Sequence, residues 1–535
     1  MSREYNDKFY KKYGANIHSD PVRFDKIASL CKGDVLDLAC GTGDLADYTK
    51  NSYTGVDISE VAVSMAKKMR PATAIFWCQD VTARSFDAIK RYDTIVLAEF
   101  LEHLEDDLKL FENIFQCAKP DTRLIISVPN GNRVPDEDHK RTFTIPELRA
   151  RFSELGKVKF YNWPGERQRI IFTVDLGQKN EGQLALAIIA KDEGLGIEQT
   201  ILSAIELADQ IVISVDEKSK DETLEIAKNY ADVLIRHNFN NDFSGTRNFL
   251  QKEVTTKWVL WLDGHEFLKY GKDIDKNFKD DVDGYFVKIR LETGFTFWFS
   301  RLIKKEIEWQ YQVHNTTKTK NLRRHKELMI QHDREKSQTK ESIEERNQQR
   351  EKMVFEILGK RLKENKKDAR AAFYLAQHYN ARKEYRKAIK FYKKYIKNSR
   401  IKQERWLVFY EIGNCYNYMN KTRRAIKFFR KADKELPRRW EIYKKIGATL
   451  MTRKKWLEAA DNLVASFGRV NAEFMYNPEK ENDAQTWFFL CQCFIALERC
   501  EQAKISAREA LKENEKNNNE LLPEEFKKIL EIVIK

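Results

Sequence analysis

The sequence predicts a multidomain protein with two α/β domains followed by an all-α helical repeat domain. Short apolar runs alternate with helical stretches up to about residue 178, and a second series of such runs begins near residue 183. From about residue 340 the strand-like runs give way to one recurring helical pattern. Alternation of strands and helices is typical of a parallel sheet wrapped by helices. The predicted domains are residues 1–178, 183–338 and 340–535.

Length and composition set the broad class of the protein. The chain has 535 residues, which at roughly 150 residues per domain corresponds to three or four domains. Hydrophobic residues make up 42% and aromatic residues 12% of the chain, which excludes a disordered or low-complexity protein. No apolar run approaches the roughly 20 residues of a membrane-spanning helix, and the first residues contain no stretch typical of a secretory signal. We therefore expect a cytoplasmic protein without a membrane span.

Each α/β domain is predicted from its own series of β-rich runs. Polar residues 175–183, which include two glycines, separate the two series. Such a segment is typical of a domain boundary. The first series comprises residues 35–40, 53–58, 74–79, 94–100, 124–128 and 169–174, and the second comprises residues 184–190, 210–216, 232–237, 258–263 and 284–289.

A pair of small residues twelve positions apart recurs four times after residue 340. Successive pairs are 37, 34 and 44 residues apart, near the 34-residue period of helix-turn-helix repeats. The pattern resembles tetratricopeptide repeats, and a generic helical bundle is the alternative. The long last step predicts an insertion of about ten residues near residues 469–483. The pairs are Ala376 with Ala388, Gly413 with Ala425, Gly447 with Ala459, and Cys491 with Ala503.

The positive charge is concentrated in the helical region. The formal net charge is 0 over residues 1–180, −3 over residues 181–339 and +17 over residues 340–535, which accounts for the total of +14. A basic surface of this kind attracts an acidic partner, or it keeps a helical surface soluble. Both interpretations remain open from the sequence.

The first candidate site follows the first predicted strand. Asp37, Ala39, Gly41 and Gly43 lie in the segment DLACGTG, at the turn from this strand into a helix. Small residues there let backbone amides approach a ligand at the helix N-terminus. Asp57 ends the second predicted strand, where a carboxylate accepts hydrogen bonds from ribose hydroxyls. The pattern therefore predicts a nucleoside-containing cofactor.

These motifs resemble class I S-adenosylmethionine-dependent methyltransferases, which have a Rossmann-like fold, across about residues 1–178. The family motif D-x-G-x-G-x-G appears here with Ala39 at its first glycine. The resemblance implies S-adenosylmethionine as the cofactor. By position, Asp80 at the end of the third strand would contact the adenine amine.

The segment AEFLEHL resembles a segment of small-molecule and sugar methyltransferases. The resemblance implies that Glu99 lies beside the methyl donor. His103 is a candidate general base, because a neutral imidazole accepts a hydroxyl proton near pH 7. The alternative is that Glu102 and His103 only shape the start of a helix. The N-P-P-F/Y/W tetrapeptide of base-amine methyltransferases is absent, which disfavours nucleic-acid amines as substrates.

The second candidate site lies at the ends of strands in the second domain. The first of these strands runs directly into polar residues that include Lys191 and Glu193, which we expect to contact substrate. The segment WLDGHEFL places Asp263, His265 and Glu266 after another apolar strand. Polar groups at the carboxyl ends of parallel strands mark the ligand crevice of an open α/β sheet. An aspartate and a histidine there suit a divalent cation that bridges a diphosphate.

This region resembles the inverting glycosyltransferases of the GT-A type, family 2, over about residues 183–330. Their D-x-D motif appears as Asp263-Gly264-His265, a D-x-H variant similar to that of peptide N-acetylgalactosaminyltransferases. In that relative a distant histidine completes the metal site, and the segment WQYQVHN offers His314. The resemblance implies manganese or magnesium and a nucleotide-sugar donor, with a UDP-sugar expected.

The same resemblance assigns further positions. Asp216 would hold the uracil or ribose, and Asp221, Arg247 and Asp263 would line the donor, with Asn248 fixing a loop. A carboxylate must deprotonate the acceptor, and Glu266 or Glu292 is the candidate base. Trp309 either stacks on a sugar or belongs to the core.

Together the motifs predict a bifunctional enzyme. The first domain would methylate, with sugar O-methylation expected, and the second would transfer a sugar to a protein, peptide or glycan acceptor docked on the basic repeats. One alternative is a binding scaffold with a degenerate enzymatic domain. Another is a nucleic-acid-modifying glycosyltransferase, which is disfavoured because the basic residues are spread among repeats with few clustered aromatics.

Overall fold

The protein divides into two compact units, which are described separately. The first comprises residues 1–292, 300–311 and 315–340, and the second comprises residues 293–299, 312–314 and 341–535. The computed structural model describes residues 2–14, 20–87, 90–131, 137–162, 169–179, 182–269, 276, 278–292, 296–334, 340–437, 439–467, 483–516 and 522–534.

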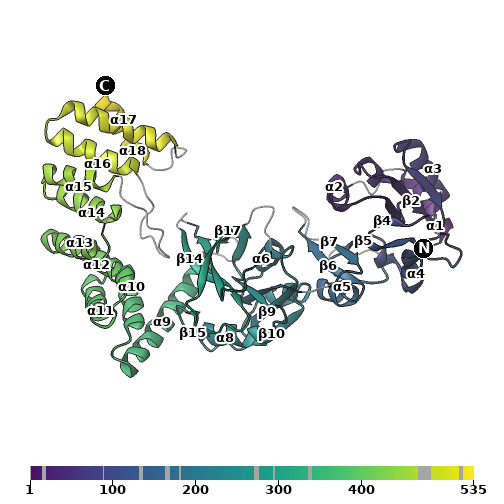
Figure 1. Cartoon of the computed structure of the whole chain (residues 1–535), viewed down its shortest axis with the longest axis horizontal. Coiled ribbons are helices and arrows are strands. Elements are labelled where there is room, and N and C mark those ends of the chain that lie inside the picture. The colour runs from purple at the N-terminus through teal and green to yellow at the C-terminus, as the bar shows by residue number, and fades with distance from the viewer. Residues whose placement is uncertain are drawn as a thin grey trace. The chain divides into compact units, whose positions relative to one another are not determined.

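The first unit contains a seven-stranded sheet built by the first part of the chain (Figure 1). Its strand order is β3-β2-β1-β4-β5-β7-β6, in which β1 to β5 are parallel and β7 pairs antiparallel with both β5 and β6. The strands are β1 (Val35–Leu38), β2 (Tyr53–Asp57), β3 (Ile75–Cys78), β4 (Tyr92–Ala98), β5 (Ala118–Pro129), β6 (Gly156–Tyr161) and β7 (Arg169–Leu176).

Helices connect the parallel strands and cover the sheet. Their starts follow capping rules: the Asp20 side chain accepts a hydrogen bond from the amide of Arg23 before α2, and the Ser59 side chain accepts one from Ala62 before α3. The helices are α1 (Arg3–Tyr13), α2 (Pro21–Leu30), α3 (Glu60–Met69), α4 (Leu108–Cys117) and α5 (Ile145–Phe152), with short 3-10 turns η1 (Asp44–Asp47) and η2 (Leu101–His103).

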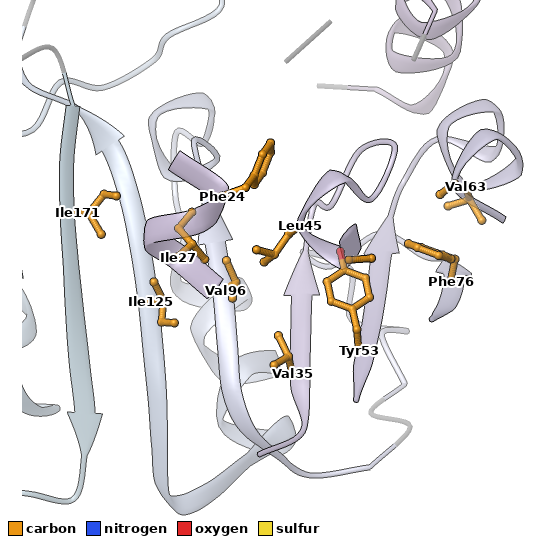
Figure 2. Close-up of a cluster of buried hydrophobic side chains, with 12 residues drawn as sticks. Phe24, Ile27, Val35, Leu45, Tyr53, Val63, Phe76, Val96, Ile125 and Ile171 are labelled. Atoms are coloured by element: carbon orange, nitrogen blue, oxygen red, sulfur yellow. The ribbon is translucent and has the colours of Figure 1, made fainter. Parts of the chain in front are cut away.

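A hydrophobic core lies between α2 and the sheet. Figure 2 shows Ile27 of α2 beside Val96 and Ile125 of the central strands, and Phe24 of the same helix belongs to the same cluster. Ile27, Val96 and Ile125 are fully buried, and burial of such a side chain contributes roughly 1.5–3 kcal/mol. The core therefore fixes the strand ends on which the first candidate site is built.

The first unit also contains an eight-stranded sheet, with strand order β10-β9-β8-β11-β14-β13-β17-β12. Strands β8 to β11 are parallel, whereas β14 pairs antiparallel with β11 and β12 pairs antiparallel with β17. The elements are β8 (Leu184–Ala190), α6 (Ile197–Ala204), β9 (Gln210–Asp216), α7 (Thr223–Lys228), β10 (Val233–His237), α8 (Phe243–Gln251), β11 (Trp258–Asp263), β12 (Glu266–Lys269), β13 (Gly284–Arg290), β14 (Thr296–Lys304) and β17 (Leu322–His332), with a small ribbon of β15 (Trp309–Gln310) and β16 (Thr316–Thr317).

The prediction of two α/β domains is confirmed by these two sheets. All eleven predicted strands are present, whereas β6, β12, β14, β15, β16 and β17 were not predicted. Each of these six has an antiparallel neighbour in its sheet. Polar and apolar residues alternate in β6, and residues 323–327 of β17 are all polar, so neither strand contains a long apolar run and both are hard to recognise.

The second unit consists mainly of paired helices, which confirms the predicted all-α repeat. Consecutive helices pair as α10 with α11, α12 with α13, α14 with α15 and α16 with α17, and the pairs stack one after another (Figure 1). The helices are α9 (Lys340–Glu364), α10 (Ala369–Ala381), α11 (Tyr385–Asn398), α12 (Lys402–Tyr418), α13 (Thr422–Glu435), α14 (Trp440–Met451), α15 (Trp456–Ser466), α16 (Asp483–Ala496), α17 (Cys500–Lys516) and α18 (Glu524–Ile534).

The eight small residues that revealed the repeat are all buried. A Cβ added at Gly413 would lie 2.4 Å from a ring carbon of Phe429 in the partner helix, so a larger residue would push the pair apart. The predicted insertion near residues 469–483 lies almost entirely outside the described residues. None of the described helices is both long enough and apolar enough to cross a bilayer.

Candidate functional site

The turn after β1 has the backbone geometry of a ligand-binding loop. Ala39, Gly41 and Gly43 all have positive φ angles, of 60°, 54° and 70°. A Cβ at Gly41 would lie 2.6 Å from the Tyr10 hydroxyl. Glycine is therefore required at this position, where the turn runs close against α1.

A cavity of about 360 Å³ opens beside this turn. Its wall combines the ends of parallel strands with residues of α1, among them Tyr5 and Tyr10. Gly43 is not part of the wall. The predicted residues that line the cavity are Asp37, Ala39, Gly41, Asp57, Asp80, Glu99 and His103.

Asp57 braces the turn at the end of β2. Its Oδ2 accepts a hydrogen bond from the Gly41 amide at 2.8 Å, and its Oδ1 accepts one from the Ser59 amide at 2.9 Å. Burial raises the pKa of Asp57, and the amides of Ser59 and Gly41 oppose this effect. Each carboxylate oxygen has a second lone pair, so the side chain can also accept a hydrogen bond from a ligand in the cavity.

Two further carboxyl groups of the cavity are tied to neighbouring residues. Asp37 Oδ2 accepts a hydrogen bond from the Tyr53 hydroxyl at 2.7 Å. Burial raises the pKa of Asp37 to about 7, although this hydrogen bond opposes the rise. Asp80 Oδ1 accepts hydrogen bonds from the amide and hydroxyl of Thr82 at 2.9 and 2.7 Å. These contacts orient both side chains toward the cavity that they line.

The segment after β4 brings two glutamates together. Glu99 has a φ of 53° and accepts a hydrogen bond from Arg169 Nε at 2.8 Å. Glu102 is 1% exposed, and neither of its carboxylate oxygens has a hydrogen-bond partner among the described residues. Burial, reinforced by the charge of Glu99, raises the pKa of Glu102 to about 9. The raised pKa favours the protonated form of Glu102 at neutral pH, because a charge without a hydrogen-bond partner is costly to bury.

Two histidines complete this end of the cavity. The ring centroids of His103 and His139 are 5.0 Å apart, and His103 Nδ1 lies 3.2 Å from the backbone oxygen of Asp138. Glu102, His103 and His139 each offer a ligand atom, and these atoms all lie within 4.8 Å of one another. The histidine predicted as a base thus belongs to a polar cluster that also lines the cavity.

The second candidate site lies at the carboxyl ends of β8, β9 and β11. Asp216 ends β9, is buried, and lies 3.8 Å from the Lys191 amine. Asp221 accepts hydrogen bonds from Gly194 and Thr223. Although partial burial favours a higher pKa for Asp221, these hydrogen bonds hold its pKa below the usual value. The side chains of Lys191, Asp216 and Asp221 thus gather at one edge of the sheet.

Asp263, the first residue of the Asp-Gly-His segment, is held by two buried arginines. Arg247 Nη2 lies 2.7 Å from Asp263 Oδ1, and Arg301 Nη2 lies 3.4 Å from Asp263 Oδ2. Although burial opposes ionisation, these guanidinium groups hold the pKa of Asp263 far below its usual range. Burial lowers the pKa of Arg247 to about 10, so both partners remain charged at neutral pH.

Trp309 and its neighbours pack against Arg247, the arginine closer to Asp263. Trp309 is 1% exposed, and its ring lies 4.8 Å from the Arg247 guanidinium, which also lies 5.5 Å from the Trp261 ring. Asn248 donates a hydrogen bond to the Trp309 carbonyl at 2.9 Å and accepts one from its amide at 2.7 Å. Trp309 therefore belongs to the core rather than to an exposed stacking surface.

The two candidate bases have different environments. Glu266 is 1% exposed, and its carboxylate accepts hydrogen bonds from Arg301 at 2.7 Å and from the Asp263 amide at 2.9 Å. Burial raises the pKa of Glu266. The Glu292 side chain is 39% exposed. Of these two carboxylates, Glu292 has the greater access to a ligand.

His265 contacts a histidine that was not predicted. His265 Nδ1 lies 3.1 Å from Glu193 Oε1, and His265 Nε2 lies 3.2 Å from Nε2 of His332 at the end of β17. The predicted distant histidine, His314, belongs to the second unit. There its ring stacks on Tyr374 at 3.8 Å.

Four residues of these sites were missed by sequence reasoning: Glu102 as a site residue, His139, Arg301 and His332. Arg301 and His332 lie on β14 and β17, which were not predicted as strands. His139 lies in a polar segment without a motif. Glu102 was visible in the sequence, but only the structure shows that its carboxylate has no hydrogen-bond partner within the described part of the chain.

Two family models match separate parts of the chain. The family model for a methyltransferase domain matches residues 19–169, and the model for glycosyl transferase family 2 matches residues 186–346. The ubiquinone biosynthesis O-methyltransferase of Coxiella burnetii (strain RSA 493 / Nine Mile phase I) is 34% identical over 122 residues, which cover 21% of this chain and 52% of that protein. The putative methyltransferase YqeM of Bacillus subtilis (strain 168) is 28% identical over 156 residues, 25% of this chain and 62% of that protein. The chain thus spans about half the length of the O-methyltransferases that it matches.

Similar solved structures include that of MamA, with 14% identity and a TM-score of 0.29, and the DhpI-SAH complex, with 19% identity and a TM-score of 0.28. Each of these two matches covers 33% of this chain and 95% of the chain in the solved structure. Parts of the chain thus match a methyltransferase domain (residues 19–169) and a family 2 glycosyltransferase domain (residues 186–346), and a region of paired helices follows.

Proposed function

We propose that the protein is a bifunctional, cytoplasmic enzyme that transfers a sugar from a nucleotide-sugar to a protein, peptide or glycan and methylates with S-adenosylmethionine. The observation that carries the proposal is the presence of two separate polar clusters, each at the carboxyl ends of parallel strands in one of the two matched domains. Ligands of open α/β sheets bind at such positions.

In the methyltransferase domain, S-adenosylmethionine would occupy the 360 Å³ cavity. Asp57 would accept hydrogen bonds from the ribose hydroxyls and Asp80 one from the adenine amine, while the turn at Ala39 and Gly41 would let the backbone approach the donor. Asp37 and Gly43 would belong to the same donor-binding segment. Glu99, tied to Arg169, would lie beside the methyl-bearing end.

Methyl transfer to a hydroxyl group requires a base, and His103 is suited to this role. Its imidazole lines the cavity and would take the proton as the acceptor oxygen attacks the methyl group. A sugar hydroxyl is the acceptor that we propose, because the second domain would handle a sugar in the same protein. Protonated Glu102 would donate a hydrogen bond to the acceptor without adding a negative charge beside it.

In the glycosyltransferase domain, Asp216 and Lys191 would bind the nucleoside of a UDP-sugar, and Asp221 would shape the loop beside it. Arg247 and Arg301 hold Asp263 in a fixed orientation. The carboxylate of Asp263 and the imidazole of His265 fit a divalent cation such as manganese or magnesium by the chemistry of their donor atoms. Such a cation would neutralise the departing nucleoside diphosphate.

Glu292 is the carboxylate that we propose as the base for an inverting transfer. It would take a proton from the acceptor as the acceptor oxygen attacks the sugar. Glu266 is unsuited to this step, since its oxygens already bind Arg301 and the Asp263 amide.

The basic repeats would dock the acceptor. Residues 340–535 carry a net charge of +17, and stacked helix pairs form an extended surface suited to a macromolecular partner. An acidic protein, peptide or glycan fits this charge. The competing function is that of a repeat scaffold with one degenerate enzymatic domain.

One experiment tests the proposal directly. The full-length protein is incubated with S-adenosylmethionine, manganese and a panel of sugar nucleotides, and the products are analysed by mass spectrometry. Release of free sugar is the minimum expected result, and a methylated sugar would link the two activities. The scaffold alternative predicts that at least one donor stays intact under all conditions.

A further inference from the structure

A short segment before α5, residues 137–144, forms part of the wall of the methyltransferase cavity. Asp138 and His139 of this segment line the cavity. The Lys140 amide donates a hydrogen bond to the Glu102 carbonyl at 2.7 Å. The segment therefore packs around the end of the cavity at which Glu102 lies, the end where we place the methyl acceptor.

The residues that flank this segment are joined to one another. Asn130, directly after β5, forms an isolated β-bridge with Phe143, and the Gly131 amide donates a hydrogen bond to the Phe143 carbonyl at 2.8 Å. Ile145 follows as the first residue of α5. These four residues form a common base for the segment, which we call the loop base.

The loop base contacts the glycosyltransferase domain, which belongs to the same compact unit. Asn130 Nδ2 donates a hydrogen bond to the Tyr230 hydroxyl at 2.9 Å, and this hydroxyl donates one to Glu198 Oε1 at 2.5 Å. The Ile145 amide donates a hydrogen bond to the Asn229 carbonyl at 3.1 Å. Amides in the first turn of a helix have no partner within that helix, so α5 obtains this partner from the other domain.

One turn further along α5, an ion pair joins the same two parts of the chain. Arg149 Nε lies 3.0 Å from Asp232 Oδ1. Asn130 and Tyr230 are each 1% exposed, and Arg149 is 8% exposed. A buried polar group that loses its partner is costly unless water replaces that partner. The contacts between the two domains therefore resist opening.

The opposite side of the cavity is built from contacts within the methyltransferase domain. The turn after β1 is held by the hydrogen bond from the Gly41 amide to Asp57 at the end of β2. Asp80 is oriented by Thr82. The side that would hold S-adenosylmethionine thus depends on local contacts, whereas the side with His139 depends on a loop base that contacts the other domain.

We propose that the glycosyltransferase domain completes the acceptor side of the methyltransferase cavity, with Asn229, Tyr230 and Asp232 as positioning residues for residues 137–144. The identity of this side as the acceptor side rests on the proposed function, whereas the contacts that hold the segment do not. Loss of these contacts should loosen the segment and leave the binding of S-adenosylmethionine unchanged. The two domains would then be combined in one chain because the first needs the second for its shape.

Hydrogen exchange in the full-length protein, followed by mass spectrometry, measures how often the segment opens. Tyr230→Phe removes only the hydroxyl group that binds Asn130. Exchange of residues 137–144 should become about 2- to 10-fold faster, which corresponds to one hydrogen bond. Exchange of residues 35–57 and the affinity for S-adenosylmethionine, measured by calorimetry, should stay at their wild-type values.

Glu206→Gln is the matched control. Glu206 belongs to the glycosyltransferase domain and contacts the Asn162 amide and the Lys26 amine of the methyltransferase domain. Neither partner belongs to residues 137–144 or to the loop base. This variant should therefore leave the exchange of the segment as it is in wild type.

A double substitution tests whether the effect passes through Asn130. Tyr230→Phe also removes a hydrogen bond from Glu198, so a single variant does not separate the two contacts. Asn130→Ala should speed exchange of the segment by itself, and Tyr230→Phe should add little in the Asn130→Ala background, since residues that share one contact are not additive. Fully additive effects would contradict the proposed contact.

Unchanged exchange of residues 137–144 in a folded Tyr230→Phe protein would overturn the proposal, as would an equal increase in Glu206→Gln. If Tyr230→Phe does not fold, Asp232→Asn, which weakens the pair with Arg149, decides by the same criterion. Faster exchange of the segment in a protein that binds no S-adenosylmethionine would support the domain contact and argue against the proposed methyltransferase activity. Binding of S-adenosylmethionine with unchanged exchange would do the reverse.

Discussion

Arg247 donates a hydrogen bond at 2.7 Å to Asp263, the first residue of the Asp-Gly-His segment. Arg301 reaches the other carboxylate oxygen of the same residue. The aspartate expected to contact a metal-bound diphosphate is therefore also the counter-ion of two buried guanidinium groups. This double role determines which substitution can test the site.

Replacement of Asp263 by alanine should lower stability as well as activity. Removal of the carboxylate leaves Arg247 and Arg301 buried with less negative charge nearby, and breaking such a pair costs roughly 3–5 kcal/mol, with the low end expected for a partly exposed aspartate. Asp263→Asn keeps the shape and one acceptor oxygen. We expect Asp263→Asn to stay closer to the wild-type melting temperature than Asp263→Ala, and both to lose sugar-donor hydrolysis. Equal melting temperatures for Asp263→Ala and wild type would contradict the ion-pair argument.

Asp57→Ala should weaken binding of S-adenosylmethionine about 10- to 150-fold, because a hydrogen bond to a charged group contributes roughly 1.5–3 kcal/mol. The variant also removes the acceptor of the Gly41 amide, which orders the turn. Calorimetry on the full-length protein measures the affinity. Asp34→Ala is the matched control, since this aspartate pairs with Lys90 away from the cavity lining. Equal affinity in Asp57→Ala and Asp34→Ala would rule out the ribose contact.

Glu102→Gln should change how stability depends on pH. The pKa of Glu102 is raised to about 9 in the folded protein, above its unfolded value of 4.5. The stabilising contribution of its protonated form is full below about pH 4.5 and is lost as pH rises through about 9. Melting curves from pH 5 to 9 should show wild type losing stability relative to Glu102→Gln. The control Glu112→Gln removes an exposed glutamate and should run parallel to wild type.

Removal of the helical region should spare sugar-donor hydrolysis and abolish transfer to a macromolecular acceptor. A protein that ends near residue 338 retains residues 293–299 and 312–314, which belong to the second unit. A truncated protein can therefore fail for structural reasons, and a substitution in the intact chain is the better test.

Neutralising exposed charge on α13 provides that test. Arg423, Lys427 and Arg430 recur on α13 at helical spacing and are all exposed. Their replacement by glutamine should slow transfer to an acidic acceptor at low salt and have little effect at high salt, since screening removes the attraction. The control replaces Lys8, Lys67 and Lys68, which are exposed on α1 and α3. An equal effect of both triple variants would show that docking depends only on total charge.

The first candidate site was predictable because its residues lie within short motifs. The turn after β1 and the ends of β2, β3 and β4 carry Asp37, Gly41, Asp57, Asp80 and Glu99, and parallel pairing brings these strand ends to one edge. Each residue of such a site can be predicted from the motif at the end of its own strand. Ala39 replaces the first glycine of the family motif and has a φ of 60°, but the rest of the motif was sufficient to recognise it.

The second site was only partly predictable, because its residues meet through antiparallel pairing. His332 reaches His265 through the pairing of β17 with β12, and Arg301 reaches Asp263 through the pairing of β14 with β11. Strand β12 has only four residues, and most residues of β17 are polar, so their pattern does not indicate a strand. No local motif marks a contact between residues 67 positions apart.

The wall of the methyltransferase cavity formed by α1 has a consequence for the order of assembly during synthesis. Asp7 of α1 accepts hydrogen bonds from the Ser59 hydroxyl at 2.5 Å and from the Val61 amide at 3.2 Å. A ribosome adds roughly 5–20 residues per second, so this helix is complete several seconds before its docking residues are made. The wall that α1 contributes to the cavity can therefore form only after Ser59 and Val61 have been made.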